Sequence, residues 1–243
     1  MIDLDIIIPV YNSSTSIKKL IERLNSWSKN SSHKFQVIFI DDNSHDDSSE
    51  KILAEPKDFD FQVIQLAKNY GQHTATAIGL SKSTAPFVAT IDDDLQHDPF
   101  ELENLYKTLI DENVDLVYGT YHKKEHHTFR NFGSWLLKKI LHLAGLNYNT
   151  VTSFRLMKAK VAKTFKNTNN ISNIIFIDEY LARIAKKQSF TIINHYNREI
   201  GNSSYTSWKL IKFTLKIILF HTSIPLRFIT RFGLIMSVIF FLF

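Results

Sequence analysis

Three consecutive aspartates, Asp92, Asp93 and Asp94, are the residues of this chain best suited to chemistry. Residues 87–91 before them are apolar or β-branched, which predicts a buried strand. Because side chains alternate between the faces of a strand, we expect Asp92 and Asp94 to converge and Asp93 to point away. Paired carboxylates repel each other without a counter-ion, and such oxygen ligands suit Mg²⁺ or Mn²⁺. The sequence therefore predicts a divalent-metal site, and a solvated acidic turn is the alternative.

Strand and helix patterns alternate along the first 120 residues and would position these acids. The predicted strands are residues 5–10, 36–40, 61–66, 87–91 and 115–118. The predicted helices are residues 14–27, 47–54, 71–83 and 99–111, the first with Ser14 or Thr15 as its N-cap. This order predicts an α/β fold with a mostly parallel sheet and helices on both faces. Ligands bind at the carboxyl ends of such strands, where the aspartates are expected.

Charge is divided unevenly between the two halves of the chain. Residues 1–120 carry 20 Asp and Glu against 10 Lys and Arg, whereas residues 121–243 carry 4 acids against 19 bases. We therefore expect an acidic half that holds cations and a basic half that faces phosphates or an anionic membrane. The apolar end of the chain favours lipid, so nucleic acid is not expected as a partner. The chain has no cysteine, which excludes disulfides and thiolate metal sites and favours a reducing, cytosolic setting.

The second half is expected to be helical and to associate with a membrane. Residues 129–143 and 207–220 have the pattern of amphipathic helices, and the second carries Lys209, Lys212 and Lys216 on one stripe. That pattern is typical of a helix in a membrane interface, although a helix buried against the domain has the same periodicity. Residues 232–243 are uncharged and apolar, so we expect the start of a truncated transmembrane segment preceded by arginines on the cytoplasmic side.

Four motifs resemble the family-two glycosyltransferases of the GT-A fold. They are Pro9-Val10-Tyr11-Asn12, Asp41-Asp42-Asn43-Ser44, Lys68-Asn69-Tyr70-Gly71-Gln72 and Asp92-Asp93-Asp94-Leu95-Gln96-His97-Asp98-Pro99. More narrowly, they resemble the branch with dolichyl-phosphate mannose synthase and the bacterial polyprenyl-phosphate glycosyltransferases. The resemblance covers essentially the whole chain and implies a Rossmann-like catalytic domain over residues 1–205. Within it, residues 1–120 would bind donor and metal and residues 121–205 the acceptor, and residues 206–243 would be membrane-associated.

The resemblance also implies roles for individual residues. The donor would be a nucleotide-diphosphate sugar, with UDP or GDP left open, and a metal held by Asp92 and Asp94 with help from Gln96 would bridge its phosphates. His97 is not expected to be a ligand. Contacts with the nucleotide sugar are implied for Pro9, Tyr11, Asn12, Asp41, Asp42, Lys68, Asn69, Gly71, Asp92, Asp93, Arg198 and Ser203. For Asp41 and Asp42, ordinary turn and cap chemistry at a strand end is the alternative.

Three positions depart from the family pattern. Ser13 replaces an acid, Tyr121 replaces the arginine of Gly-Thr-Arg, and Ser204 replaces a lysine. Lys123, Lys124 or Arg130 would substitute for the missing arginine, with Arg130 expected on the acceptor phosphate. Arg155 matches a family position and is expected there too, with a plain surface arginine as the alternative.

The acceptor decides whether a general base is needed. A hydroxyl acceptor must lose a proton as it attacks, whereas a lipid phosphate is already an anion. Asp178 and Glu179 form the acidic pair of the second half, so Asp178 is a catalytic candidate beside Asp94 and Arg198. The pair is explained equally well as the N-cap and first turn of a helix at residues 180–187.

The sequence therefore predicts an inverting glycosyltransferase that moves a hexose to polyprenyl phosphate, undecaprenyl or dolichyl, at the cytoplasmic membrane with its catalytic domain in the cytoplasm. A growing polysaccharide or another glycan hydroxyl is the alternative acceptor, and a catalytically silent scaffold is the alternative outside the enzymes. Membrane lipids are expected partners, and homo-oligomerisation is left open.

Overall fold

The computed structural model of the chain describes residues 2–121, 152–168, 171, 174, 176–194 and 224–242. Within them, seven strands form one sheet in the order β3-β2-β1-β4-β6-β5-β7. The strands are β1 (Leu4–Val10), β2 (Phe35–Asp41), β3 (Asp60–Gln65), β4 (Phe87–Thr90), β5 (Leu116–Tyr121), β6 (Arg155–Lys158) and β7 (Gln188–Ile193). All neighbouring strands pair in parallel except at β6, which is antiparallel to both β4 and β5. The predicted α/β fold with a mostly parallel sheet is confirmed.

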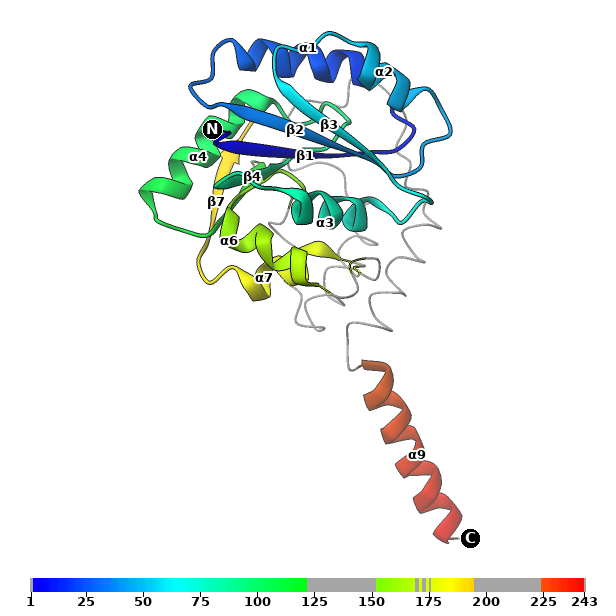
Figure 1. Cartoon of the computed structure of the whole chain (residues 1–243). Coiled ribbons are helices and arrows are strands. Elements are labelled where there is room, and N and C mark those ends of the chain that lie inside the picture. Colours follow the sequence, from blue (N-terminus) through cyan, green and yellow to red (C-terminus); the bar gives the residue numbers. More distant parts are fainter. Residues whose placement is uncertain are drawn as a thin grey trace, which may run out of the picture. The chain divides into compact units, whose positions relative to one another are not determined.

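Helices cover both faces of this sheet (Figure 1). They are α1 (Ile17–Ser28), α2 (Ser48–Ala54), α3 (Gln72–Lys82), η1 (Pro99–Glu101), α4 (Leu102–Asp111), α6 (Ala159–Ala162), η2 (Lys163–Asn167) and α7 (Ile177–Ile184). A further helix, α9 (Ile224–Leu242), belongs to a separate unit. Alternation along β1 divides its side chains between two cores: Ile6 and Ile8 pack with α1, and Ile7 packs with α3. Helix α3 lies so close to the sheet that a Cβ on Gly79 would be 2.2 Å from the Ile7 Cγ2. Only glycine permits that approach.

The first half has the predicted elements, and their ends agree with the prediction or differ by up to three residues. Helix α1 begins later than predicted, because Ser16 and not Ser14 or Thr15 is its N-cap, without a side-chain capping bond. Helix α7 begins three residues before the predicted start at Tyr180, so Asp178 lies in its first turn and Phe176 is the N-cap. The second half, which was expected to be helical, also contains strands, because β6 and β7 complete the sheet.

The chain divides into two compact units, Met1–Lys123 with Thr150–Gly201, and Lys124–Asn149 with Asn202–Phe243. In the second unit the described residues form α9. No helix in the described part of the chain is both long and apolar enough to cross a membrane. The amphipathic helices expected at residues 129–143 and 207–220 lie outside the described residues. The predicted domain boundary after residue 205 stays a prediction.

Candidate active site

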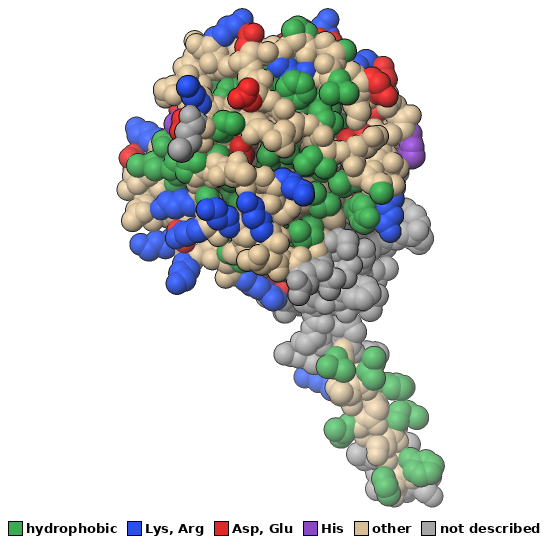
Figure 2. Space-filling view, in the orientation of Figure 1, with side chains coloured by type: hydrophobic (Ala, Val, Ile, Leu, Met, Phe, Trp, Pro, Cys, Tyr) green, Lys and Arg blue, Asp and Glu red, His purple; other side chains and the backbone are tan. Residues whose placement is uncertain are grey.

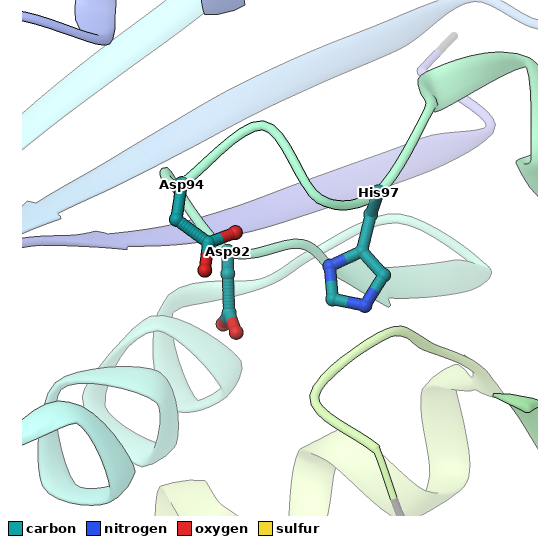
Figure 3. A group of neighbouring side chains, drawn as sticks. All are labelled: Asp92, Asp94 and His97. Carbon is teal, nitrogen blue, oxygen red and sulfur yellow. The ribbon is translucent and has the colours of Figure 1, made fainter. Parts of the chain in front are cut away.

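The loop after β4 gathers three potential metal ligands. Strand β4 ends at Thr90, so the aspartate triplet lies in the following turn and not in the strand. One ligand atom from each of Asp92, Asp94 and His97 lies within 4.8 Å of the other two. The three side chains extend from the same loop, with the two carboxylates next to each other (Figure 3). Sequence reasoning missed His97, although its place three residues after Asp94 in the same loop was a usable signal.

Asp92 is held by donors from distant parts of the chain. The side-chain amide of Gln72, at the start of α3, donates to the Asp92 Oδ1 at 2.6 Å. The hydroxyl of Ser153, just before β6, donates to the Asp92 Oδ2. Burial raises the pKa of the Asp92 carboxyl, and the neighbouring Asp94 adds to this, whereas His97 and Ser153 oppose it. Each carboxylate oxygen has a second lone pair, so these bonds leave Asp92 able to bind a cation.

Asp93 turns away from this cluster toward the loop after β1. Its Oδ2 accepts hydrogen bonds from the Ser13 hydroxyl and from the Tyr11 backbone N–H, the latter at 3.4 Å. The pKa of Asp93 is raised to about 7, mainly by burial and also by Asp92 and Asp94, although the hydrogen bond from the Ser13 hydroxyl lowers it. Asp93 therefore points away from Asp92 and Asp94, as expected. A turn after β4 produces this arrangement, and not the alternation of side chains along a strand. The Ser13 hydroxyl donates a hydrogen bond to the Asp93 carboxylate, whereas the acid of the family pattern at this position would repel that carboxylate.

His97 is fixed on the side away from the aspartates. Its Nε2 shares a 2.5 Å hydrogen bond with the Tyr121 hydroxyl, and its ring stacks on Phe154 with centroids 5.0 Å apart. Burial and the nearby Asp92 and Asp94 raise the pKa of Tyr121, so the hydroxyl keeps its proton. Tyr121, where the family pattern has arginine, thus positions a side chain of the metal cluster.

The aspartates that end β2 have partners within the chain. Asp41 accepts from the Ser44 N–H at 2.9 Å and from the Ser49 hydroxyl at 2.5 Å. Asp42 accepts from the N–H groups of Tyr70 and Gly71, both at 2.7 Å. Burial raises the pKa of Asp42, and these two N–H donors oppose it. The turn-chemistry alternative accounts for these contacts, and the expected nucleotide contact stays a prediction.

The other described residues that are expected on the nucleotide sugar lie at the same end of the sheet. Pro9 lies in β1, and Tyr11 follows it with 42% of its surface exposed. Asn12, with φ of 51°, donates its N–H to the Ser44 hydroxyl and so ties two loops together. The remaining members are exposed or at the start of α3: Lys68, whose Nζ lies 5.0 Å from the Tyr70 ring centroid, exposed Asn69, and Gly71 with φ of 92°.

Arg155 and Asp178 form a buried ion pair. The guanidinium donates to both Asp178 oxygens at 2.8 Å, and the two side chains are only 3% and 4% exposed. Arg155 also donates to the Thr90 hydroxyl and the Ser153 carbonyl, both at 3.2 Å. Burial alone would lower the pKa of Arg155, but the Asp178 carboxylate raises it. The surface-arginine alternative is therefore wrong, and a contact of Arg155 with an acceptor phosphate would require this pair to open.

Several expected site residues cannot be compared with the geometry. Arg130, Arg198, Ser203, Ser204, Lys123 and Lys124 lie outside the described residues. Gln96 is half-buried, and its backbone N–H donates to the Asp94 Oδ1 at 3.2 Å. Its role as a metal ligand stays a prediction.

The cluster has the chemistry and nearly the dimensions of a divalent-cation site. Two carboxylates and an imidazole are ligands that Mn²⁺ accepts, and carboxylates suit Mg²⁺. The three ligand atoms lie within 4.8 Å of one another, so side-chain movements would bring all three onto one cation.

A comparison with protein-family models and a comparison with individual proteins agree with each other. The model of the family described as Glycosyl transferase family 2 matches residues 5–178. Undecaprenyl-phosphate 4-deoxy-4-formamido-L-arabinose transferase from Pseudomonas syringae pv. syringae (strain B728a) is 28% identical over 243 residues, 96% of this chain and 70% of that protein.

Two solved structures show the same fold. Glucosyl-3-phosphoglycerate synthase from Mycobacterium tuberculosis, in complex with Mn²⁺, uridine diphosphate and glucosyl-3-phosphoglycerate, has a TM-score of 0.58 at 14% identity, covering 89% of this chain and 77% of that chain. Mannosyl-3-phosphoglycerate synthase from Rubrobacter xylanophilus also has a TM-score of 0.58 at 14% identity, covering 89% and 74%. The predicted GT-A fold is confirmed.

Proposed function

The chain belongs to glycosyl transferase family 2, and on that premise we propose that it transfers a hexose from a nucleotide-diphosphate sugar to polyprenyl phosphate. It is a glycosyltransferase, as are the relatives that it matches. The observation that carries the proposal is the convergence of Asp92, Asp94 and His97 at the carboxyl end of β4. A parallel α/β sheet binds its ligands at this end, and a diphosphate needs positive charge there when it leaves.

On the donor side, Asp92 and Asp94 would hold Mg²⁺ or Mn²⁺, with His97 as a third ligand that Mn²⁺ accepts. When bound, the ion acts as a Lewis acid that neutralises the departing diphosphate. The loops after β1 and β2 would receive the nucleoside, since Asn12 and Ser44 bind them together and Tyr11 is exposed beside them. Arg198 and Ser203 are proposed to contact the donor phosphates.

On the acceptor side, the geometry of Asp178 favours a phosphate. A hydroxyl acceptor needs a carboxylate that is free to take its proton. Both oxygens of Asp178 already accept from Arg155 in a pair that is almost fully buried. We therefore propose that Asp178 orients Arg155 and is not a base, and that the acceptor is an anion that needs none. The undecaprenyl-phosphate transferase name of the relative from Pseudomonas syringae supports the lipid phosphate.

Attachment to the cytoplasmic membrane face and inversion at the sugar carbon are part of this proposal. Helix α9 supports attachment, because it carries a run of exposed apolar side chains, Leu226, Ile229, Phe232, Leu234, Phe240 and Phe241. Direct attack by the lipid phosphate on the sugar carbon inverts it in one step. A glycan hydroxyl remains the alternative acceptor.

Incubation with Mn²⁺, a panel of UDP- and GDP-hexoses and undecaprenyl or dolichyl phosphate tests the proposal. We expect a lipid-linked sugar phosphate and an equal amount of the nucleoside diphosphate, UDP or GDP. Asp94→Asn should abolish metal-dependent turnover without changing attachment to membranes, and Asp111→Asn, at an exposed position of α4, should leave turnover unchanged. Nucleotide release that requires a glycan hydroxyl, and not a lipid phosphate, would overturn the proposal.

A further inference from the structure

The turn that carries Asp94 is held in an unusual backbone conformation. Leu95, the residue after it, has φ of 66°, in the left-handed region that leucine rarely adopts. Such a conformation persists only where the surroundings impose it. The Leu95 side chain is fully buried, in the same core cluster as Leu20 and Leu24 of α1. Helix α1 thus holds the turn through the packing of the Leu95 side chain.

Helix α1 also holds the backbone of this turn. The guanidinium of Arg23, from the same helix, donates to the Leu95 carbonyl oxygen at 2.9 Å. Arg23 is half-buried, so this bond is partly shielded from water. A charged donor forms a stronger bond to a carbonyl than a neutral donor does. Side-chain packing and this hydrogen bond therefore fix the residue between Asp94 and Gln96 from two directions.

The conformation of Leu95 determines where two of the three cluster members point. The Gln96 N–H donates back to the Asp94 Oδ1 at 3.2 Å, so the direction of that N–H orients the Asp94 carboxylate. The same reversal of the chain brings His97 back to within 4.8 Å of Asp92 and Asp94. An extended Leu95 would send Gln96 and His97 away from the carboxylates.

We propose that Arg23 is a positioning residue for the metal cluster, acting through the Leu95 carbonyl. It touches no reacting group, and its part is to keep the turn closed so that Asp94 and His97 are preorganised for the cation. This inference rests on the proposed metal site, but not on the identity of donor or acceptor.

Titration of the 243-residue chain with Mn²⁺ alone, read from the electron paramagnetic resonance signal of free Mn²⁺, tests the inference without turnover. Arg23→Met should weaken Mn²⁺ binding by about tenfold, the lower end of the effect of outer partners at metal sites. Arg23→Lys, which keeps a charged donor, should recover most of the affinity. Lys18→Met removes an exposed charge from the same helix and should bind as the wild type does.

Thermal unfolding without metal separates positioning from general stability. A residue that only stabilises the fold lowers the melting temperature and leaves the Mn²⁺ dissociation constant of the folded protein unchanged, and that result for Arg23→Met overturns the inference. If Arg23→Met does not fold, the comparison of Arg23→Gln with Arg23→Lys decides in the same way. Wild-type protein that binds no Mn²⁺ overturns the metal site as well, whereas equal binding by wild type and Arg23→Met overturns the role of Arg23 alone.

Discussion

Replacing Asp178 by asparagine tests whether this residue is an ion-pair partner or a base. Asparagine keeps the shape of the side chain but removes the charge opposite Arg155, whose side chain is only 3% exposed. Removing one partner of a buried ion pair costs about 3–5 kcal/mol, because the other charge is left without compensation. We expect the free energy of unfolding of Asp178→Asn to fall by this amount.

A double-mutant cycle isolates the pair. Arg155→Met should destabilise the protein by a similar amount, since it leaves the Asp178 carboxylate buried alone. The double variant should lose less than the two single losses added together, with a coupling of about 2 kcal/mol, as is typical for residues in contact. Equilibrium unfolding in urea measures all four proteins. Arg183→Gln is the control, because Arg183 is 75% exposed and pairs with Glu179 on the same helix, where about 0.5 kcal/mol is expected.

The same variants test whether Asp178 acts as a general base. A general base contributes about 10²–10⁴-fold to the rate, so removing it from a folded enzyme gives a loss of rate that is easily measured. We expect the double variant, assayed well below its melting temperature, to transfer sugar to undecaprenyl phosphate at a rate much closer to the wild type than that. Strictly additive unfolding energies would refute the coupling of the pair. A hundredfold loss of rate in the double variant relative to Arg155→Met, with both proteins folded, would restore Asp178 as a base.

Three further predictions concern acid stability, helix packing and acceptor binding. Burial lowers the pKa of His73 from 6.5 to about 4, so wild-type stability should fall by about 3 kcal/mol relative to His73→Gln as the pH drops from 6.5 to 4, measured by urea unfolding across that range. Gly79→Ala should cost about 1–3 kcal/mol by overpacking against Ile7, and a melting temperature equal to that of the wild type would contradict the contact. Arg130→Gln should raise the KM for undecaprenyl phosphate more than it lowers kcat, whereas Lys186→Gln at an exposed position should change neither.

The parallel half of the fold was predictable because its signals are local. Strands β1, β2 and β4 are short, mainly apolar runs, each followed by a polar loop and a helix. Strand β7 ends in an aromatic and β-branched run that is typical of a strand and was missed, whereas β6 gave no such signal. The β6 sequence, Arg155-Leu156-Met157-Lys158, is four residues long with a charge at each end, and only its pairing with β4 and β5 makes it a strand. Long-range pairing of that kind leaves no periodicity to read.

The candidate site was predictable where its residues are neighbours in sequence. Asp92 and Asp94 share one motif, so their convergence followed from the chain itself. Gln72 and Ser153 contact Asp92 across 20 and 61 residues of sequence, and no spacing rule links them. Likewise, nothing in the sequence pairs Arg155 with Asp178, so the two were given separate roles.

The basic residues of the second half differ in which end of the sheet they lie at. Exposed lysines and arginines gather over α6 and α7 (Figure 2). Lys160 follows β6 where it pairs with the start of β4, and Lys186 precedes β7, so both lie at the amino end of the sheet, opposite the metal cluster. At the carboxyl end, Arg155 is neutralised by Asp178. A phosphate beside Asp92 and Asp94 therefore lies at the opposite end of the sheet from the basic surface over α6 and α7. Exposed Lys68, after β3, and the predicted contacts Arg130 and Arg198 are the candidates to meet it.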